Sequence, residues 1–144
     1  MRLRILVFED DVNIREILVQ ILTSKGHDVF AYPDPSACPV YNHSTCGCAK
    51  NQPCADILIT DINMPNMSGL DLLASQQQKG CQILPPHKAV ISADLSGLER
   101  EDLKNLHFRA FKKPFRFSEL LAWVDECEAH TLQGRQLTPL DKIA

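Results

Sequence analysis

The sequence lacks any long hydrophobic run, and no apolar stretch approaches the roughly 20 residues needed to span a bilayer. It also lacks an excess of basic residues: the 144-residue chain has a formal net charge of −3, which gives nucleic-acid binding no electrostatic support. Internal repeats and low-complexity tracts are absent as well. We therefore expect no membrane or direct nucleic-acid partner, and the length suits one domain with a substantial core.

We expect no signal peptide among the first residues. Met1-Arg2-Leu3-Arg4 leads directly into a strand-like run, with Glu9 and Asp10 behind it. We therefore expect a cytoplasmic protein. In a reducing compartment, clustered cysteines indicate metal binding or redox chemistry more than disulfides, and an oxidising compartment would reverse that preference. The six cysteines are Cys38, Cys46, Cys48, Cys54, Cys81 and Cys127.

Short apolar runs alternate with segments of helical periodicity. Asp11 is expected to cap the first helix and Gly26 to stop it, and a second helix is expected to end near Gly80. A short charged helix is expected over 98–106, and Ser118 is expected to cap the last helix. The apolar runs predict five strands, over residues 3–8, 29–32, 55–60, 88–91 and 109–112.

This order predicts an α/β fold with a doubly wound parallel sheet. Residues 33–54 break the alternation, because they carry four prolines together with four cysteines, and proline this dense excludes a long regular helix. The second helix of the fold is thus expected to be replaced or distorted by this insert. The C-terminal tail, residues 131–144, contains glycine, proline and scattered charge, and is a candidate for disorder.

Polar residues stand at the ends of the predicted strands. Right-handed crossovers bring the carboxyl ends of parallel strands to one edge, where α/β folds bind ligands. Three carboxylates and one ammonium gathered there describe a site for a divalent cation and a phosphoryl group. Taken singly, each residue fits a helix cap, a turn or a solvated surface position. The residues concerned are Glu9, Asp10, Asp61, Ser92 and Lys113.

These residues, in this order and spacing, resemble the receiver domain of two-component response regulators. The resemblance covers roughly residues 3–130, nearly the whole chain, and it implies a flavodoxin-like sheet with five parallel strands in the order 2-1-3-4-5. The matching pieces are Glu9-Asp10, Arg15, Asp61 with Met64-Pro65 and Gly69, Ser92-Ala93, and Lys113-Pro114-Phe115.

The resemblance implies a role for each site residue. Asp61 would be the phosphoacceptor, a nucleophile taking a phosphoryl group from a histidine kinase or a phosphotransfer protein. Asp10 would ligate Mg²⁺ directly and Glu9 through water, with Asp61 and the backbone carbonyl of Asn63 completing the protein ligands. Such a protein is a signalling receiver and not an enzyme, apart from its own phosphoryl transfer and autodephosphorylation, and an unidentified effector protein would read its state.

Further residues would act once phosphate is bound. By the same resemblance, Lys113 would pair with one phosphoryl oxygen and Ser92 would hydrogen-bond another. Asn63 and Asp94, each two residues beyond a site residue, would tune the lifetime of the phosphoryl group by helping to place the attacking water. Without the metal, the clustered acids would raise one another's pKa by mutual repulsion.

The chain departs from the family pattern at two places. Ala110 stands where the family has its switch aromatic; Phe111 is one residue late, which turns its ring to the opposite face, and we expect it in the core. The second departure is the cysteine segment, which suits a structural zinc, an iron–sulfur cluster, reduced packed thiols or disulfides. The cysteines in question are Cys38, Cys46, Cys48 and Cys54, whereas Cys81 and Cys127 look structural.

Two alternative functions come from other classes. A phosphatase of the haloacid dehalogenase type also places a nucleophilic aspartate after a strand, but it needs a second acid two residues on, where this chain has Asn63. A metal- or redox-sensing pseudo-receiver would use the cysteine segment as its input and leave Asp61 vestigial. The acid pair and Lys113 are intact, which argues against the second alternative.

Overall fold

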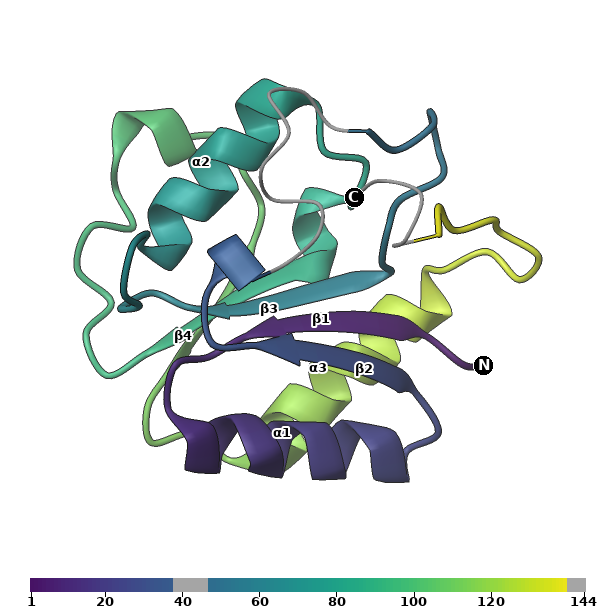
Figure 1. The fold of residues 1–144 in the computed structure, drawn as a ribbon, viewed down its shortest axis with the longest axis horizontal. Helices are drawn as coiled ribbons and strands as arrows, with labels where there is room; N and C mark the ends of the chain where they lie inside the picture. Colours follow the sequence, from purple (N-terminus) through teal and green to yellow (C-terminus); the bar gives the residue numbers. More distant parts are fainter. Residues whose placement is uncertain (38–46, 140–144) are drawn as a thin grey trace.

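The computed structural model describes residues 1–37 and 47–139, which form one parallel sheet with helices on both faces (Figure 1). The strand order is β2-β1-β3-β4-β5 and every neighbouring pair is parallel, so the predicted doubly wound fold is confirmed. The strands are β1 (Arg4–Phe8), β2 (Asp28–Tyr32), β3 (Ile57–Asp61), β4 (Lys88–Ser92) and β5 (Arg109–Lys112). The helices are α1 (Val12–Ser24), α2 (Gly69–Lys79) and α3 (Phe117–Ala129).

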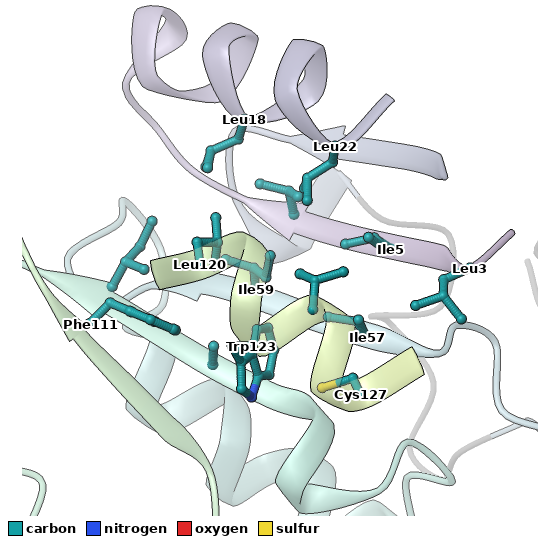
Figure 2. Close-up of a cluster of buried hydrophobic side chains, with 14 residues drawn as sticks. Leu3, Ile5, Leu18, Leu22, Ile57, Ile59, Phe111, Leu120, Trp123 and Cys127 are labelled. Atoms are coloured by element: carbon teal, nitrogen blue, oxygen red, sulfur yellow. The ribbon is translucent and has the colours of Figure 1, made fainter. Parts of the chain in front are cut away.

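Two hydrophobic clusters cover the two faces of the sheet. Helices α1 and α3 lie on one face and α2 on the other (Figure 1). Figure 2 shows Leu18 of α1 and Leu120 and Trp123 of α3 pointing toward Ile57 and Ile59 of β3. Successive side chains of a strand point to opposite faces of the sheet, so β3 contributes Leu58 to one cluster and Ile57 and Ile59 to the other. Because both faces are covered, all five residues of β3 are buried. No described helix is both long and apolar enough to cross a membrane.

The predicted ends of the first two helices agree with the structure. Asp11 is the N-cap of α1, and its side chain accepts hydrogen bonds from the backbone N–H of Asn13 (2.9 Å) and of Ile14 (3.2 Å). Gly80 ends α2 in the left-handed conformation, with φ of 79°. The predicted cap of the last helix is wrong: α3 begins at Phe117 with Arg116 as its N-cap residue, and Ser118 lies inside the first turn.

The predicted helix over 98–106 is also wrong, because this segment contains only a short 3₁₀ turn, Glu101–Leu103. Gly97 (φ 88°) and Asn105 (φ 74°) adopt left-handed conformations on either side of it, which a continuous right-handed helix excludes. Arg100 fixes the turn instead, through ion pairs with Asp71 at the start of α2 (2.6 Å) and with Asp102 (2.7 Å). The backbone hydrogen bonds of this segment run from an N–H to the carbonyl three residues back, as in turns and 3₁₀ helices, and the Arg100 ion pairs add to them.

The described parts of the insert, residues 33–37 and 47–54, contain one 3₁₀ turn and no α-helix. This agrees with the expectation that the dense prolines displace the second helix of the fold. Residues 47–54 lead towards β3, and just before this strand Cys54 and Ala55 are buried in the cluster beneath α2. Residues 38–46 lie outside the described part of the chain.

The first part of the tail, residues 131–139, lies against the amino edge of the sheet, whereas the sequence suggested disorder. Arg135 pairs with the buried carboxylate of Asp56 (2.6 Å) and donates to the backbone oxygen of Arg2 (3.0 Å). The guanidinium of Arg4 donates to the carbonyl of Thr138 (3.0 Å), and the N–H of Thr138 donates to the carbonyl of Pro53 (2.9 Å). The tail therefore joins β1 to the end of the insert.

Replacing Arg135 with alanine tests this anchoring. The Arg135→Ala variant leaves the buried Asp56 with only the backbone N–H of Arg4 as partner, so we expect a loss of about 2–4 kcal/mol in unfolding free energy. Urea denaturation followed by circular dichroism measures it. The control is Arg2→Ala, because the pair of Arg2 with Asp28 is solvent-exposed and contributes below about 1 kcal/mol. Equal losses in the two variants would contradict the anchoring role.

Candidate functional site

Two neighbouring strands bring three carboxylates to the carboxyl edge of the sheet. Glu9 and Asp10 follow β1, and Asp61 is the last residue of β3. Each offers an oxygen, and these three oxygens lie within 4.8 Å of one another. Within residues 1–37 and 47–139 this is the only group of three or more acids, histidines or cysteines gathered closely enough to hold an ion. Glu9 is fully buried, Asp61 is 5% exposed and Asp10 is open to solvent.

Lys113 brings a positive charge to the same point. Its Nζ lies 2.8 Å from Oε1 of Glu9 and 3.1 Å from Oδ2 of Asp61. The lysine follows β5, and its backbone N–H donates to the carbonyl of Ser92 (2.8 Å), which ties this loop to the end of β4. The Lys113–Pro114 peptide bond is cis. Lys113 is thus brought to Asp61 by a strand two positions away in the sheet.

Glu9 is the electrostatically unusual member of the cluster. Burial, together with the interaction with Asp61, raises the pKa of Glu9 to about 8 against the lowering effect of Lys113. Burial lowers the pKa of Lys113, but its hydrogen bonds to Glu9 and Asp61 outweigh this and leave that pKa raised. Oε2 of Glu9 is buried without a hydrogen-bond partner. A buried, unpartnered oxygen beside two further carboxylates is suited to a hard divalent cation such as Mg²⁺.

Ser92, at the end of β4, faces the loop that follows Asp61. Its hydroxyl oxygen accepts hydrogen bonds from Nδ2 of Asn63 (3.2 Å) and from the backbone N–H of Asp94 (3.2 Å). The backbone N–H of Asn63 in turn donates to Oδ1 of Asp61 (3.2 Å). The hydrogen bond from the backbone N–H of Ser96 holds the pKa of Asp94 below its usual value. The structure therefore brings Asn63, Ser92 and Asp94 to the same edge of the sheet as the acid cluster and Lys113.

Three further residues contact the backbone of the site and not its acidic side chains. Arg15 donates from Nη1 to the carbonyl of Glu9 (2.8 Å), and Thr60 donates to the carbonyl of Asp61 (2.9 Å). A Cβ on Gly69 would lie 2.1 Å from the carbonyl oxygen of Asp61, so only glycine fits at the start of α2. Arg15 and Gly69 belong to the family pattern, although their contacts were not predicted. Thr60 carried no sequence signal, because threonine is common in strands.

The cysteines give no support to a zinc or iron–sulfur site. Cys38 and Cys46 lie outside the described residues, so half of the proposed ligand set has no described position. Cys54 is buried in the cluster beneath α2, and Cys48 packs against that cluster. Cys127 lies in the cluster on the α1/α3 face, where burial raises the pKa of its thiol to about 12.

Phe111 is a core residue, as predicted. The residue is 3% exposed, and its ring centroid lies 5.8 Å from that of Phe115 and 6.0 Å from that of Trp123. Figure 2 shows Phe111 and Trp123 within the cluster on the α1/α3 face. Ala110 points to the other face, where it packs against the cluster beneath α2. The position of the family's switch aromatic therefore holds only a methyl group.

Comparison with known proteins places these features in a family. The family model of the response regulator receiver domain matches residues 5–125. A search of curated protein sequences found no match. The Francisella response regulator 1452 receiver domain is similar in structure, with a TM-score of 0.69 and 24% identity over 91% of this chain and 100% of that one. The chemotaxis protein CheY4 of Vibrio cholerae is also similar in structure, with a TM-score of 0.67 and 20% identity over 88% of this chain and 99% of that chain.

A third similar structure is the receiver domain of the sensor histidine kinase PA1611 from Pseudomonas aeruginosa PAO1. Its TM-score is 0.67, with 18% identity over 90% of this chain and 99% of that chain, and a magnesium ion is coordinated in its active-site cleft. Sheet order, acid cluster and family match together define a signalling receiver of two-component systems. The chain belongs to the response regulator receiver domain family.

The raised pKa of Glu9 predicts how stability depends on pH. The folded-state pKa of about 8 lies above the ordinary value of 4.5, so the stability that the bound proton contributes is complete below pH 4.5 and is lost as pH rises to about 8. Glu9→Gln keeps the uncharged shape and cannot ionise. In the presence of chelator, we therefore expect this variant to gain stability over wild type across that range. Urea unfolding at a series of pH values measures the difference, and a constant difference would contradict a protonated Glu9.

Proposed function

We propose that Asp61 accepts a phosphoryl group from a histidine kinase or a phosphotransfer protein in the presence of Mg²⁺. The observation that carries the proposal is the position of its carboxylate, 3.1 Å from the ammonium of Lys113 and within 4.8 Å of ligand oxygens on Glu9 and Asp10. A nucleophile, a counter-charge and a cation-binding cluster thus share one edge of the sheet. The family match supports this assignment.

The chemistry asks little of the protein beyond position and charge. The transferred group passes through a loose, charge-rich state, which fixed positive charges stabilise. The carboxylate of Asp61 attacks phosphorus, and the phosphoryl–nitrogen bond of the donor histidine breaks. Lys113 binds one phosphoryl oxygen and Ser92 donates a hydrogen bond to another. Asp10, Asp61 and the backbone carbonyl of Asn63 would hold Mg²⁺ directly and Glu9 would hold it through water, and the bound ion would neutralise developing negative charge.

An effector protein would read the surface beside the site. The face in question is formed by residues 93–108, β5 and α3, which border Lys113 and Ser92. Ala110 offers no ring to rotate, so the signal passes through the movement of loops. Residues 93–108 are suited to this, because only one 3₁₀ turn interrupts an otherwise irregular segment. The effector, like the kinase, is identified only by this role.

The two alternative functions lack such support. A haloacid dehalogenase-type phosphatase requires an acid where Asn63 stands, and the amide of Asn63 contacts Ser92. A pseudo-receiver driven by the cysteine segment would leave the acid cluster without purpose, although Lys113 pairs with two of its members. The phosphoacceptor function accounts for both groups of contacts.

Acetyl phosphate with Mg²⁺ tests the phosphoacceptor. We expect intact-protein mass spectrometry to show the addition of one phosphoryl group to wild type and none to Asp61→Asn, because the amide is not nucleophilic enough to form the acyl phosphate. Lys113→Ala should retain the nucleophile and react far more slowly. Asp125→Asn, an exposed acid on α3, is the control and should react like wild type. A mass increase that persists in Asp61→Asn would refute the assignment.

The lifetime of the phosphoryl group tests the role of Asp94. Its carboxylate lies two residues beyond Ser92 and stays ionised, since its pKa is lowered by Ser96. We expect spontaneous hydrolysis in wild type, and slower hydrolysis in Asp94→Lys, because a lysine does not orient the attacking water in the same way. Phosphate release from purified phosphoprotein measures both rates. Identical rates would rule out this role of Asp94.

A further inference from the structure

The side chain of Ser92 is buried, and two hydrogen bonds fix its hydroxyl oxygen in place. Ser92 is 1% exposed, and its oxygen accepts two hydrogen bonds, from Nδ2 of Asn63 and from the backbone N–H of Asp94, each 3.2 Å long. Its backbone carbonyl accepts a third from the N–H of Lys113 (2.8 Å). Three loops thus converge on this single residue at the end of β4.

These contacts determine which way the Ser92 hydroxyl can act. A serine hydroxyl has two acceptor lone pairs and one donor proton. Asn63 and Asp94 both donate, so both lone pairs are occupied and the proton has to point elsewhere. In the described part of the chain no acceptor takes that proton. Ser92 is therefore prepared as a donor, which is what an anionic phosphoryl oxygen requires.

Asn63 also connects this hydroxyl to the phosphoacceptor. Its backbone N–H donates to Oδ1 of Asp61 (3.2 Å) while its side-chain amide donates to Ser92. One residue therefore sets the spacing between the carboxylate that would carry the phosphoryl group and the hydroxyl that would bind it. The donor from Asp94 belongs to the backbone, whereas the donor from Asn63 is a side chain that can be removed.

We infer that Asn63 is a positioning residue, which orients the Ser92 hydroxyl as a ready donor for the phosphoryl group on Asp61. This inference rests on the proposed phosphoacceptor function and adds a second role to Asn63 besides placing water. It also explains how Ser92 can recognise phosphate although Ala110 supplies no ring to move with it. Prior orientation removes part of the ordering cost that binding would otherwise carry.

A double-mutant cycle with a phosphoryl mimic tests the inference. Beryllium fluoride with Mg²⁺ is titrated into the whole protein by calorimetry. We expect Asn63→Ala to weaken mimic binding by about two- to tenfold, the effect of one hydrogen bond. In a Ser92→Ala background the same change should have no further effect, because no hydroxyl remains to orient. Ser92→Thr keeps a hydroxyl and should preserve the effect of Asn63→Ala.

Controls separate positioning from general damage. Asn13→Ala makes the same chemical change at an exposed position at the start of α1 and should leave mimic affinity unchanged. Thermal melting without mimic checks that each variant is folded. If Asn63 acts only on the attacking water, Asn63→Ala changes the hydrolysis rate of the phosphoprotein and leaves mimic affinity intact, which would overturn the inference.

A second readout needs neither metal nor mimic. In the NMR spectrum of the unphosphorylated protein, the side-chain amide protons of Asn63 should shift when Ser92 is replaced by alanine; unchanged resonances would overturn the inference. A wild-type protein that binds no mimic, yet shows this shift, would defeat the phosphoacceptor proposal. If wild type binds the mimic and Asn63→Ala weakens binding equally with and without the Ser92 hydroxyl, the phosphoacceptor proposal stands and the positioning role of Asn63 is refuted.

Discussion

The ion pairs of Lys113 with Glu9 and Asp61 are the interaction on which the rest of the site depends. This ammonium faces a cluster of three acidic side chains, Glu9, Asp10 and Asp61, and burial raises the pKa of Glu9, so the acidic groups there outnumber the positive charge supplied by Lys113. Every element that brings these groups together is a strand end, and the order of the strands decides which ends are neighbours. The fold therefore matters to function mainly because it concentrates an unbalanced charge at one edge.

The strands and the candidate site could be predicted from the sequence because their signals are local. A buried parallel strand is a short apolar run, and polar residues at its end mark the edge of the sheet. Sequence reasoning reached less far where tertiary contacts decide the local structure. Residues 98–106 are fixed by Arg100 reaching Asp71 on another helix, and the tail is held by Arg135 pairing with Asp56. No local pattern announces a partner that lies dozens of residues away in the chain.

The contact between Asn63 and Ser92 shows the same limit within the site. The sequence placed both residues near the phosphoacceptor, but it did not show that one amide would reach the other hydroxyl. That contact depends on how the loop after β3 bends, which the backbone bond from Asn63 to Asp61 and the close approach of Gly69 determine together. Family patterns identify which residues take part, whereas the connections among them have to come from coordinates.

The anchored tail, residues 131–139, packs against the domain beyond the last residue that the family model matches. The family match stops at residue 125, inside α3, yet Arg135 and Thr138 contact the start of β1 and the end of the insert. These contacts lie at the amino edge, opposite the acid cluster, on the same two strands that carry Glu9 and Asp61. An expression boundary drawn at the end of α3 would release those strands at their far ends. A piece of the chain that keeps these contacts includes residues 131–139.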